Sequence, residues 1–157
     1  MDVLKFELTK FTYGPDKKPS TVVSIKINGR DFLKMVTEHE KKILAGSEDQ
    51  KLAGGHANMC PDDLYEELIF DVNSPEYHNK KTTVLICRCG SYGCGPFLTK
   101  VKELKHSVRW TKFEQPFHTK MDARSKWGTY WDFTEFGPFE FSKENYREQL
   151  EFLKRYL

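Results

Sequence analysis

The chain has 157 residues, a length that fits one domain and leaves little room for a second. Its 25 basic and 23 acidic residues give a net charge of +2, a balance that speaks against a broad electrostatic affinity for nucleic acid or anionic lipid. No stretch approaches the roughly 20 apolar residues that span a bilayer, and the alternating N-terminus is unlike a signal peptide, so we expect a cytoplasmic protein without a membrane partner.

The first half of the sequence predicts a β-hairpin followed by two helices. Apolar residues alternate at 3–11 and at 21–27, and the turn residues between these runs predict that the two strands pair. Apolar residues then recur at helical spacing, which predicts a capped helix over about 31–44. A glycine-containing loop is expected over 45–60, and a short helix that begins at a proline near 61–68.

The second half predicts a central meander of antiparallel strands. The β-branched, apolar run at 82–88 is typical of a strand covered on both faces, and 97–104 and 107–114 predict two further strands. Residues 136–142 predict a turn and a short edge strand before an amphipathic C-terminal helix. Together these elements predict a single α+β domain over 1–157. It would have an antiparallel sheet of five to six strands and two to three helices, including the C-terminal helix.

Three of the four cysteines gather in one glycine-rich turn. Cys87, Cys89 and Cys94 lie within eight residues, and in a reducing cytosol they are expected as thiols or metal ligands. The leading interpretation is that they are small buried residues, since free cysteine is among the most buried residue types. The alternatives are a reactive thiol and a zinc site. The fourth zinc ligand would be His118, and Cys60 and His56 are the alternatives.

Aromatic residues concentrate in the segment 127–136. Its rings include Trp127, Tyr130 and Trp131, and Trp and Tyr are favoured at protein interfaces because each combines a large area with a polar tip. The simpler interpretation is that the segment folds back over the core. Acidic residues within the segment speak against a stacking platform for single-stranded nucleic acid. Two further binding candidates, on neighbouring predicted strands, are Arg88 and Arg109.

Three segments of the second half resemble a group of uncharacterised bacterial proteins. They are C-R-C-G-S-Y-G-C-G-P-F at 87–97, V-R-W-T-K-F-E-Q-P at 108–116 and F-G-P-F-E-F-S-K-E-N-Y at 136–146. The group carries C-x-C-G-x-x-G-C-x-P, then V-x-W-x-x-F-x-Q-P, then F-x-F before a C-terminal helix. Members often have a histidine directly after Q-P, where this chain has Phe117 and then His118. The resemblance implies a bacterial cytosolic origin and, because the group has no assigned activity, no particular chemistry.

The sequence carries none of the phosphate-cradling, dinucleotide-binding, metalloprotease or nucleophile-elbow motifs, which favours a protein that is not an enzyme. The leading hypothesis is a non-enzymatic binding protein, for example of the immunity type, that contacts a protein partner through the aromatic surface at 127–136. The alternative is a zinc- or thiol-site protein built on Cys87, Cys89 and Cys94. The cofactor prediction is accordingly none under the first hypothesis and zinc under the second.

Overall fold

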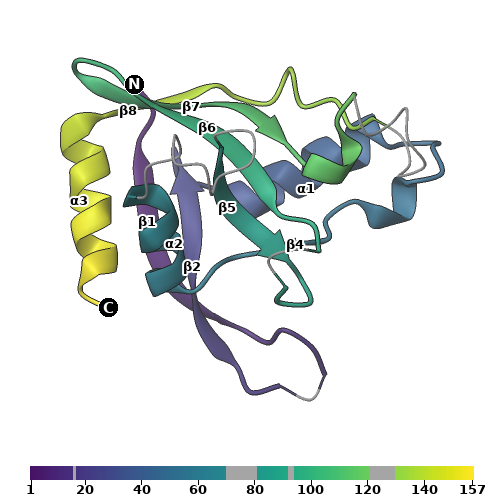
Figure 1. The fold of residues 1–157 in the computed structure, drawn as a ribbon, viewed down its shortest axis with the longest axis horizontal. Helices are drawn as coiled ribbons and strands as arrows, with labels where there is room; N and C mark the ends of the chain where they lie inside the picture. The colour runs from purple at the N-terminus through teal and green to yellow at the C-terminus, as the bar shows by residue number, and fades with distance from the viewer. Residues whose placement is uncertain (16, 70–80, 92–93, 121–129) are drawn as a thin grey trace.

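The fold contains two antiparallel sheets and three α-helices in the part of the chain that the structure describes (Figure 1). The structure is a computed structural model, and it describes residues 1–15, 17–69, 81–91, 94–120 and 130–157. The predicted α+β class is confirmed, and so are the N-terminal hairpin, the central meander and the C-terminal helix. The strands divide between two sheets, because the hairpin pairs with a short strand of its own and not with the meander.

The first sheet has the order β1-β2-β3. β1 (Leu4–Phe11) and β2 (Ser20–Ile27) pair over their whole length, and β3 (Arg30–Asp31) pairs with the end of β2. The turn into β3 is made by Asn28 and Gly29, whose φ angles are 55° and 77°. Asparagine and glycine tolerate this left-handed backbone better than other residues, so the sequence favours a tight reversal here.

The second sheet has the order β4-β5-β6-β7-β8 and contains the predicted meander. Its strands are β4 (His56–Ala57), β5 (Thr82–Cys87), β6 (Phe97–Glu103), β7 (Ser107–Glu114) and β8 (Phe139–Ser142). The two-residue strand β4 lies inside the segment predicted as a loop over 45–60, and a strand this short has no periodicity to detect. Its pairing with β5 places His56 opposite Cys87.

Three capped or proline-initiated helices surround the sheets, as the sequence predicts. They are α1 (Phe32–Ile43), α2 (Pro61–Ile69) and α3 (Lys143–Lys154). The carboxylate of Asp31 accepts the backbone N–H of Leu33 at the start of α1, and this satisfies one of the donors that a helix terminus leaves unpaired. Within the described residues, the helices lack the combination of length and apolarity that a bilayer-spanning segment needs.

Aromatic rings fill the space between α1 and the second sheet. Phe32, the first residue of α1, has no exposed surface and contributes the ring at the centre of this cluster. Its ring centroid lies 5.9 to 6.3 Å from those of Phe97, Trp110, Phe113, Phe136 and Phe139. Tilted and edge-on arrangements dominate these pairs, which is the geometry that aromatic quadrupoles favour.

Helix α3 lies along the free edge of β1 (Figure 1). The Oδ1 atom of Asn145 accepts the N–H of Leu4 at 2.8 Å, and Oε1 of Gln149 accepts the N–H of Phe6 at 2.7 Å. The Nδ2 group of Asn145 also donates to the carbonyl of Leu4 at 2.9 Å. Side-chain amides therefore take the place of a neighbouring strand and protect this part of the edge from pairing with another chain.

Candidate functional site

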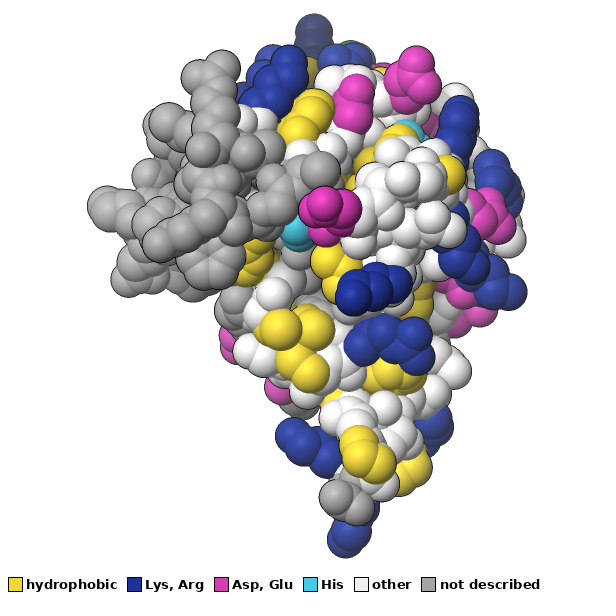
Figure 2. Space-filling model, turned by 90° about the vertical axis from the view of Figure 1, so that its right-hand side faces the viewer, with side chains coloured by type: hydrophobic (Ala, Val, Ile, Leu, Met, Phe, Trp, Pro, Cys, Tyr) yellow, Lys and Arg dark blue, Asp and Glu magenta, His cyan; other side chains and the backbone are white. Residues whose placement is uncertain are grey.

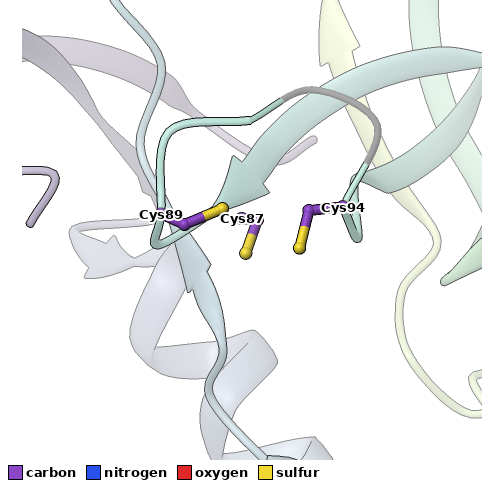
Figure 3. Close-up of side chains that lie close together, drawn as sticks. All are labelled: Cys87, Cys89 and Cys94. Atoms are coloured by element: carbon purple, nitrogen blue, oxygen red, sulfur yellow. The ribbon is translucent and has the colours of Figure 1, made fainter.

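Three thiols converge where β5 ends. The Sγ atoms of Cys87, Cys89 and Cys94 all lie within 4.8 Å of one another (Figure 3). Cys87 is the last residue of β5 and is half-buried, whereas Cys89 and Cys94 are exposed. Gly90 turns the chain directly after Cys89 with φ 88°, a left-handed conformation that favours glycine. The interpretation of these cysteines as buried packing residues is therefore wrong for Cys89 and Cys94, because the turn extends beyond the edge of the core.

The spacing of the sulfurs suits a thiolate metal site. Zinc binds sulfur at about 2.3 Å, which places the sulfurs of a tetrahedral site about 3.8 Å apart. The mutual limit of 4.8 Å is close to this value, so the three sulfurs can occupy three corners of such a site after a small approach. No fourth residue of the described chain belongs to the group that meets this limit.

Hydrogen bonds give the clustered thiols different affinities for protons. The backbone hydrogen bond at Ser91, followed by the Cys87 thiol, lowers the pKa of the Cys89 thiol because both favour the thiolate. Hydrogen bonds to Cys87 and Cys89 have the opposite effect on Cys94 and raise its pKa to about 11. Of these two exposed thiols, Cys89 is therefore the more acidic and Cys94 the less acidic.

This asymmetry predicts the order in which the thiols react. At pH 7, limiting iodoacetamide is expected to modify Cys89 first, since the thiolate is the nucleophile and its pKa is lowered. At a pKa of about 11, Cys94 has only about one thiol in ten thousand ionised at this pH, so it reacts slowly despite its exposure. Peptide mass spectrometry of the alkylated, metal-free protein measures the order. Modification of Cys94 before Cys89 would contradict it.

A buried carboxylate–imidazole pair lies beside the thiols. The Nε2 atom of His56 is 2.8 Å from Oε2 of Glu40, and the two side chains are 3% and 0% exposed. The other carboxylate oxygen of Glu40 accepts the backbone N–H of Gly54 at 2.9 Å. The Nδ1 atom of His56 is buried and, within the described residues, has no hydrogen-bond partner. From the sequence, His56 is predicted only as an alternative ligand, and Glu40 is not predicted as a site residue.

One cavity is lined by His56 of this pair and by two of the three cysteines. It has a volume of about 180 Å³, and its lining includes Cys87, Cys94, His56, His118, Gln115 and Trp131. Two of the predicted fourth ligands therefore face the same space as two of the three cysteines. His118 ends the 3₁₀ turn η3 (Pro116–His118) and stacks on Trp131 with ring centroids 4.0 Å apart. Its Nδ1 atom lies 3.9 Å from Oδ2 of Asp49.

Cys60 is not among the three sulfurs that lie within 4.8 Å of one another, and its role as an alternative fourth ligand stays a prediction. It precedes α2, and its thiol is hydrogen-bonded to the phenol of Tyr13, which itself donates to the carbonyl of Asn58. Burial, followed by the charge of Asp63, raises the pKa of the Cys60 thiol. The raised pKa makes the Cys60 thiol harder to ionise than the Cys89 thiol, whose pKa is lowered.

The aromatic segment contributes to the core and less to the surface than the sequence predicts. Trp131 is 5% exposed, and its indole N–H donates to Oδ2 of Asp49 at 3.0 Å, so its polar tip is satisfied inside the protein. The prediction of Trp131 as a surface binding residue is therefore wrong. Tyr130 is half-buried, with the ammonium of Lys120 5.6 Å from its ring centroid. Trp127 lies outside the described residues.

The two predicted anion-binding arginines do not lie together. Strand β6 separates β5 from β7, so the prediction that Arg88 and Arg109 are on neighbouring strands is wrong. The Nε and Nη2 atoms of Arg109 donate to Oε1 of Glu140 at 2.8 and 2.6 Å, so this guanidinium is already paired with a carboxylate. Arg88 is exposed at the start of the cysteine turn. The pair therefore forms no joint site for an anion.

Charged side chains are mixed on the face that Figure 2 shows. Lys and Arg side chains are spread over the described part of this face among acidic and apolar ones, and they do not gather into one basic patch.

Comparison with protein-family models, with curated proteins and with solved structures finds no match for this chain. Membership in the bacterial group with the three shared segments stays a prediction, and the functional inference depends on the geometry of the thiols.

Proposed function

We propose that this protein binds one thiophilic metal ion, zinc in the first instance, through the sulfur atoms of Cys87, Cys89 and Cys94. The observation that supports this proposal is the mutual approach of the three sulfurs to within 4.8 Å. Thiolate ligands select soft or borderline metals such as Zn(II) and Cu(I) over Mg(II) and Ca(II). A cluster of three thiolates therefore defines the class of ion.

The position of the cluster favours a metal that is exchanged over one that holds the fold together. None of the three cysteines belongs to the hydrophobic core cluster, and two of them are exposed. Structural zinc sites supply folding energy to domains that lack a sufficient core. This chain instead builds an extensive apolar core around Phe32 and Trp110, so we expect the metal-free protein to stay folded.

A redox thiol is the second candidate function, and the lowered pKa of Cys89 supports it. The Cys89 thiolate could attack a low-molecular-weight disulfide, which forms a mixed disulfide and releases one thiol. A second thiolate of the cluster would then displace the other small thiol and close a disulfide within the protein, so the small disulfide takes up the two electrons. Bound metal would protect the same thiols, so the two functions predict different products under mild oxidation.

A protein-binding role for the segment 127–136 has less support. Trp131, Phe133 and Phe136 are 5%, 4% and 8% exposed, so their rings are largely unavailable to a partner. An interface hot spot requires rings that are exposed in the free protein and become buried in the complex. The immunity-type function predicted from the sequence therefore lacks its main anchor.

Zinc binding can be measured on reduced protein purified without a histidine tag. We expect one zinc per chain by elemental analysis after removal of unbound ion. Cys87→Ser should lower the affinity by more than about 100-fold, since loss of a ligand should exceed the loss seen for outer-shell residues. Cys60→Ser is the matched control and should keep the zinc, because Cys60 is outside the group of three sulfurs and its thiol is hydrogen-bonded to Tyr13.

Two outcomes would overturn the assignment. Less than about 0.1 zinc per chain with all thiols reduced would remove the metal site. A disulfide within the turn after mild oxidation in the presence of zinc, seen as a loss of about 2 Da in the peptide, would instead favour the redox function.

A further inference from the structure

We propose that Nδ1 of His56 is the fourth ligand of the metal and that Glu40 is the residue that positions His56 for this role. The inference rests on the proposed metal-binding function and names the residue that completes the same site. It combines the strand register, the cavity beside the thiols and a buried nitrogen atom that has no partner among the described residues.

The strand register brings the imidazole to the thiols. His56 of β4 lies directly opposite Cys87 of β5. Side chains opposite each other on antiparallel strands project to the same face, with Cβ atoms about 4.5–5.5 Å apart. The backbone N–H of Arg88 also donates to the carbonyl of Gly55 at 3.1 Å, which fastens the start of the cysteine turn beside His56. His56, Cys87 and Cys94 line the same cavity of about 180 Å³.

The hydrogen bonding of His56 leaves one nitrogen for a ligand. A carboxylate accepts hydrogen bonds and does not donate them, so Nε2 of His56 carries the proton that faces Glu40. In the neutral ring Nδ1 then presents its lone pair. The residue is 5% exposed, and in the described structure Nδ1 meets no donor. Buried polar atoms without a partner are rare in native proteins, and a metal ion would satisfy this one.

Glu40 has the environment of a residue that orients a metal ligand. Its carboxylate is fully buried on α1, where one oxygen accepts the N–H of Gly54 and the other accepts Nε2–H of His56. Histidines that bind metals usually donate their second N–H to a carboxylate or carbonyl, which fixes the tautomer and the orientation of the ring. Burying a carboxylate on the apolar side of a helix costs free energy. Positioning a metal ligand is a role that accounts for a carboxylate at this place.

His118 is a weaker candidate for the fourth position although it lines the same cavity. Its ring lies flat against Trp131, and its Nδ1 atom faces Asp49 at 3.9 Å. These contacts already hold the ring of His118 in place. The Nδ1 atom of His56 has no hydrogen bond to give up in the described structure, but it lies outside the 4.8 Å group, so metal binding must bring the thiols and β4 closer together.

Cobalt(II) in place of zinc reports the ligand set directly. Wild-type protein should show intense d–d bands typical of tetrahedral coordination by three sulfurs and one nitrogen. His56→Asn should shift the d–d bands to longer wavelength, keep the thiolate-to-cobalt charge-transfer band and weaken cobalt binding by about 10-fold or more. His118→Asn is the matched control and should leave the spectrum unchanged. The reverse pattern, with His118→Asn shifting the bands and His56→Asn silent, would overturn the proposal.

Glu40 is tested by comparing two variants. Glu40→Ala should weaken cobalt binding by about 10- to 100-fold, the range for outer-shell partners, and should broaden the d–d bands because the imidazole is no longer held. Glu40→Gln keeps an oxygen that can accept Nε2–H and should restore most of the affinity and the band shape. Equal spectra for Glu40→Ala and wild type would show that Glu40 does not position the ligand.

A measurement on the wild-type chain covers the case in which the buried variants do not fold. In protein with ¹⁵N-labelled histidine, zinc should shift Nδ1 of one histidine whose Nε2 stays protonated, and no other histidine nitrogen should shift comparably. Zinc bound at full stoichiometry with the His56 nitrogens unchanged would overturn this inference and leave the thiolate site standing. Failure of the wild-type protein to bind zinc or cobalt would overturn both.

Discussion

Phe32→Ala is expected to lower the free energy of unfolding by about 3–5 kcal/mol, the range measured for the loss of a buried aromatic ring. The ring of Phe32 is fully buried and touches rings from β6, β7, β8 and the segment before β8. Its loss leaves a cavity where α1 meets the second sheet. For a domain of this size, the melting temperature should fall by about 6–20 °C.

Urea unfolding followed by circular dichroism measures this change. Tyr156→Ala is the control, since its ring is 47% exposed at the end of the chain and its loss should cost less than about 1 kcal/mol. A loss below about 1 kcal/mol for Phe32→Ala as well would mean that α1 is not anchored by this ring. The midpoint should shift without a change in slope if only stability is affected.

Trp131→Ala is expected to have an effect of similar size, about 3–5 kcal/mol. The substitution removes the stack on His118, where the ring centroids are 4.0 Å apart, and the hydrogen bond to Asp49 at 3.0 Å. It also removes one wall of the cavity beside the thiols. Trp131→Phe keeps a flat aromatic ring but loses the indole N–H and part of the ring volume, so it should cost about 1–3 kcal/mol.

The two Trp131 variants separate a core residue from an interface residue. Thermal unfolding of both variants measures how much stability each substitution removes. The zinc content per chain shows whether loss of the cavity wall affects metal binding by the thiols. If Trp131→Ala left the melting temperature unchanged and abolished the capture of a partner protein, Trp131 would be an interaction residue after all. The burial of its side chain predicts the opposite result.

Local patterns were sufficient for most elements of the fold. The alternation of apolar residues predicts β1 and β2, and the cap at Asp31 marks the start of α1 within one residue. Local patterns do not specify which strands become neighbours. The composition of the second sheet depends on contacts such as the pairing of β4 with β5, whose opposed residues His56 and Cys87 are far apart along the chain.

The part of the candidate site that lies within one turn was predictable from the sequence, and the part that comes from other elements was not. The spacing of Cys87, Cys89 and Cys94 predicts their convergence, because they belong to one turn. Glu40 was missed although a signal exists: it follows Phe32 and Val36 at intervals of four residues, so a carboxylate stands in the apolar stripe of α1. Its partner His56 lies on a strand of two residues that no periodicity reveals.

The burial of Trp131 could not be predicted from the local sequence. An aromatic segment has the same composition whether its rings face a partner or the core of its own chain. The decisive contact is the hydrogen bond to Asp49, which is 82 positions away along the chain. Nothing local to the segment 127–136 specifies this contact.

The amides of α3 have a consequence for the order of folding during synthesis. The N–H groups of Leu4 and Phe6 find their acceptors on Asn145 and Gln149, 141 and 143 positions later. A ribosome synthesises the chain from N to C, so β1 emerges well before the helix that supplies these acceptors. Until α3 follows, the outer edge of β1 is open to pairing with other nascent chains.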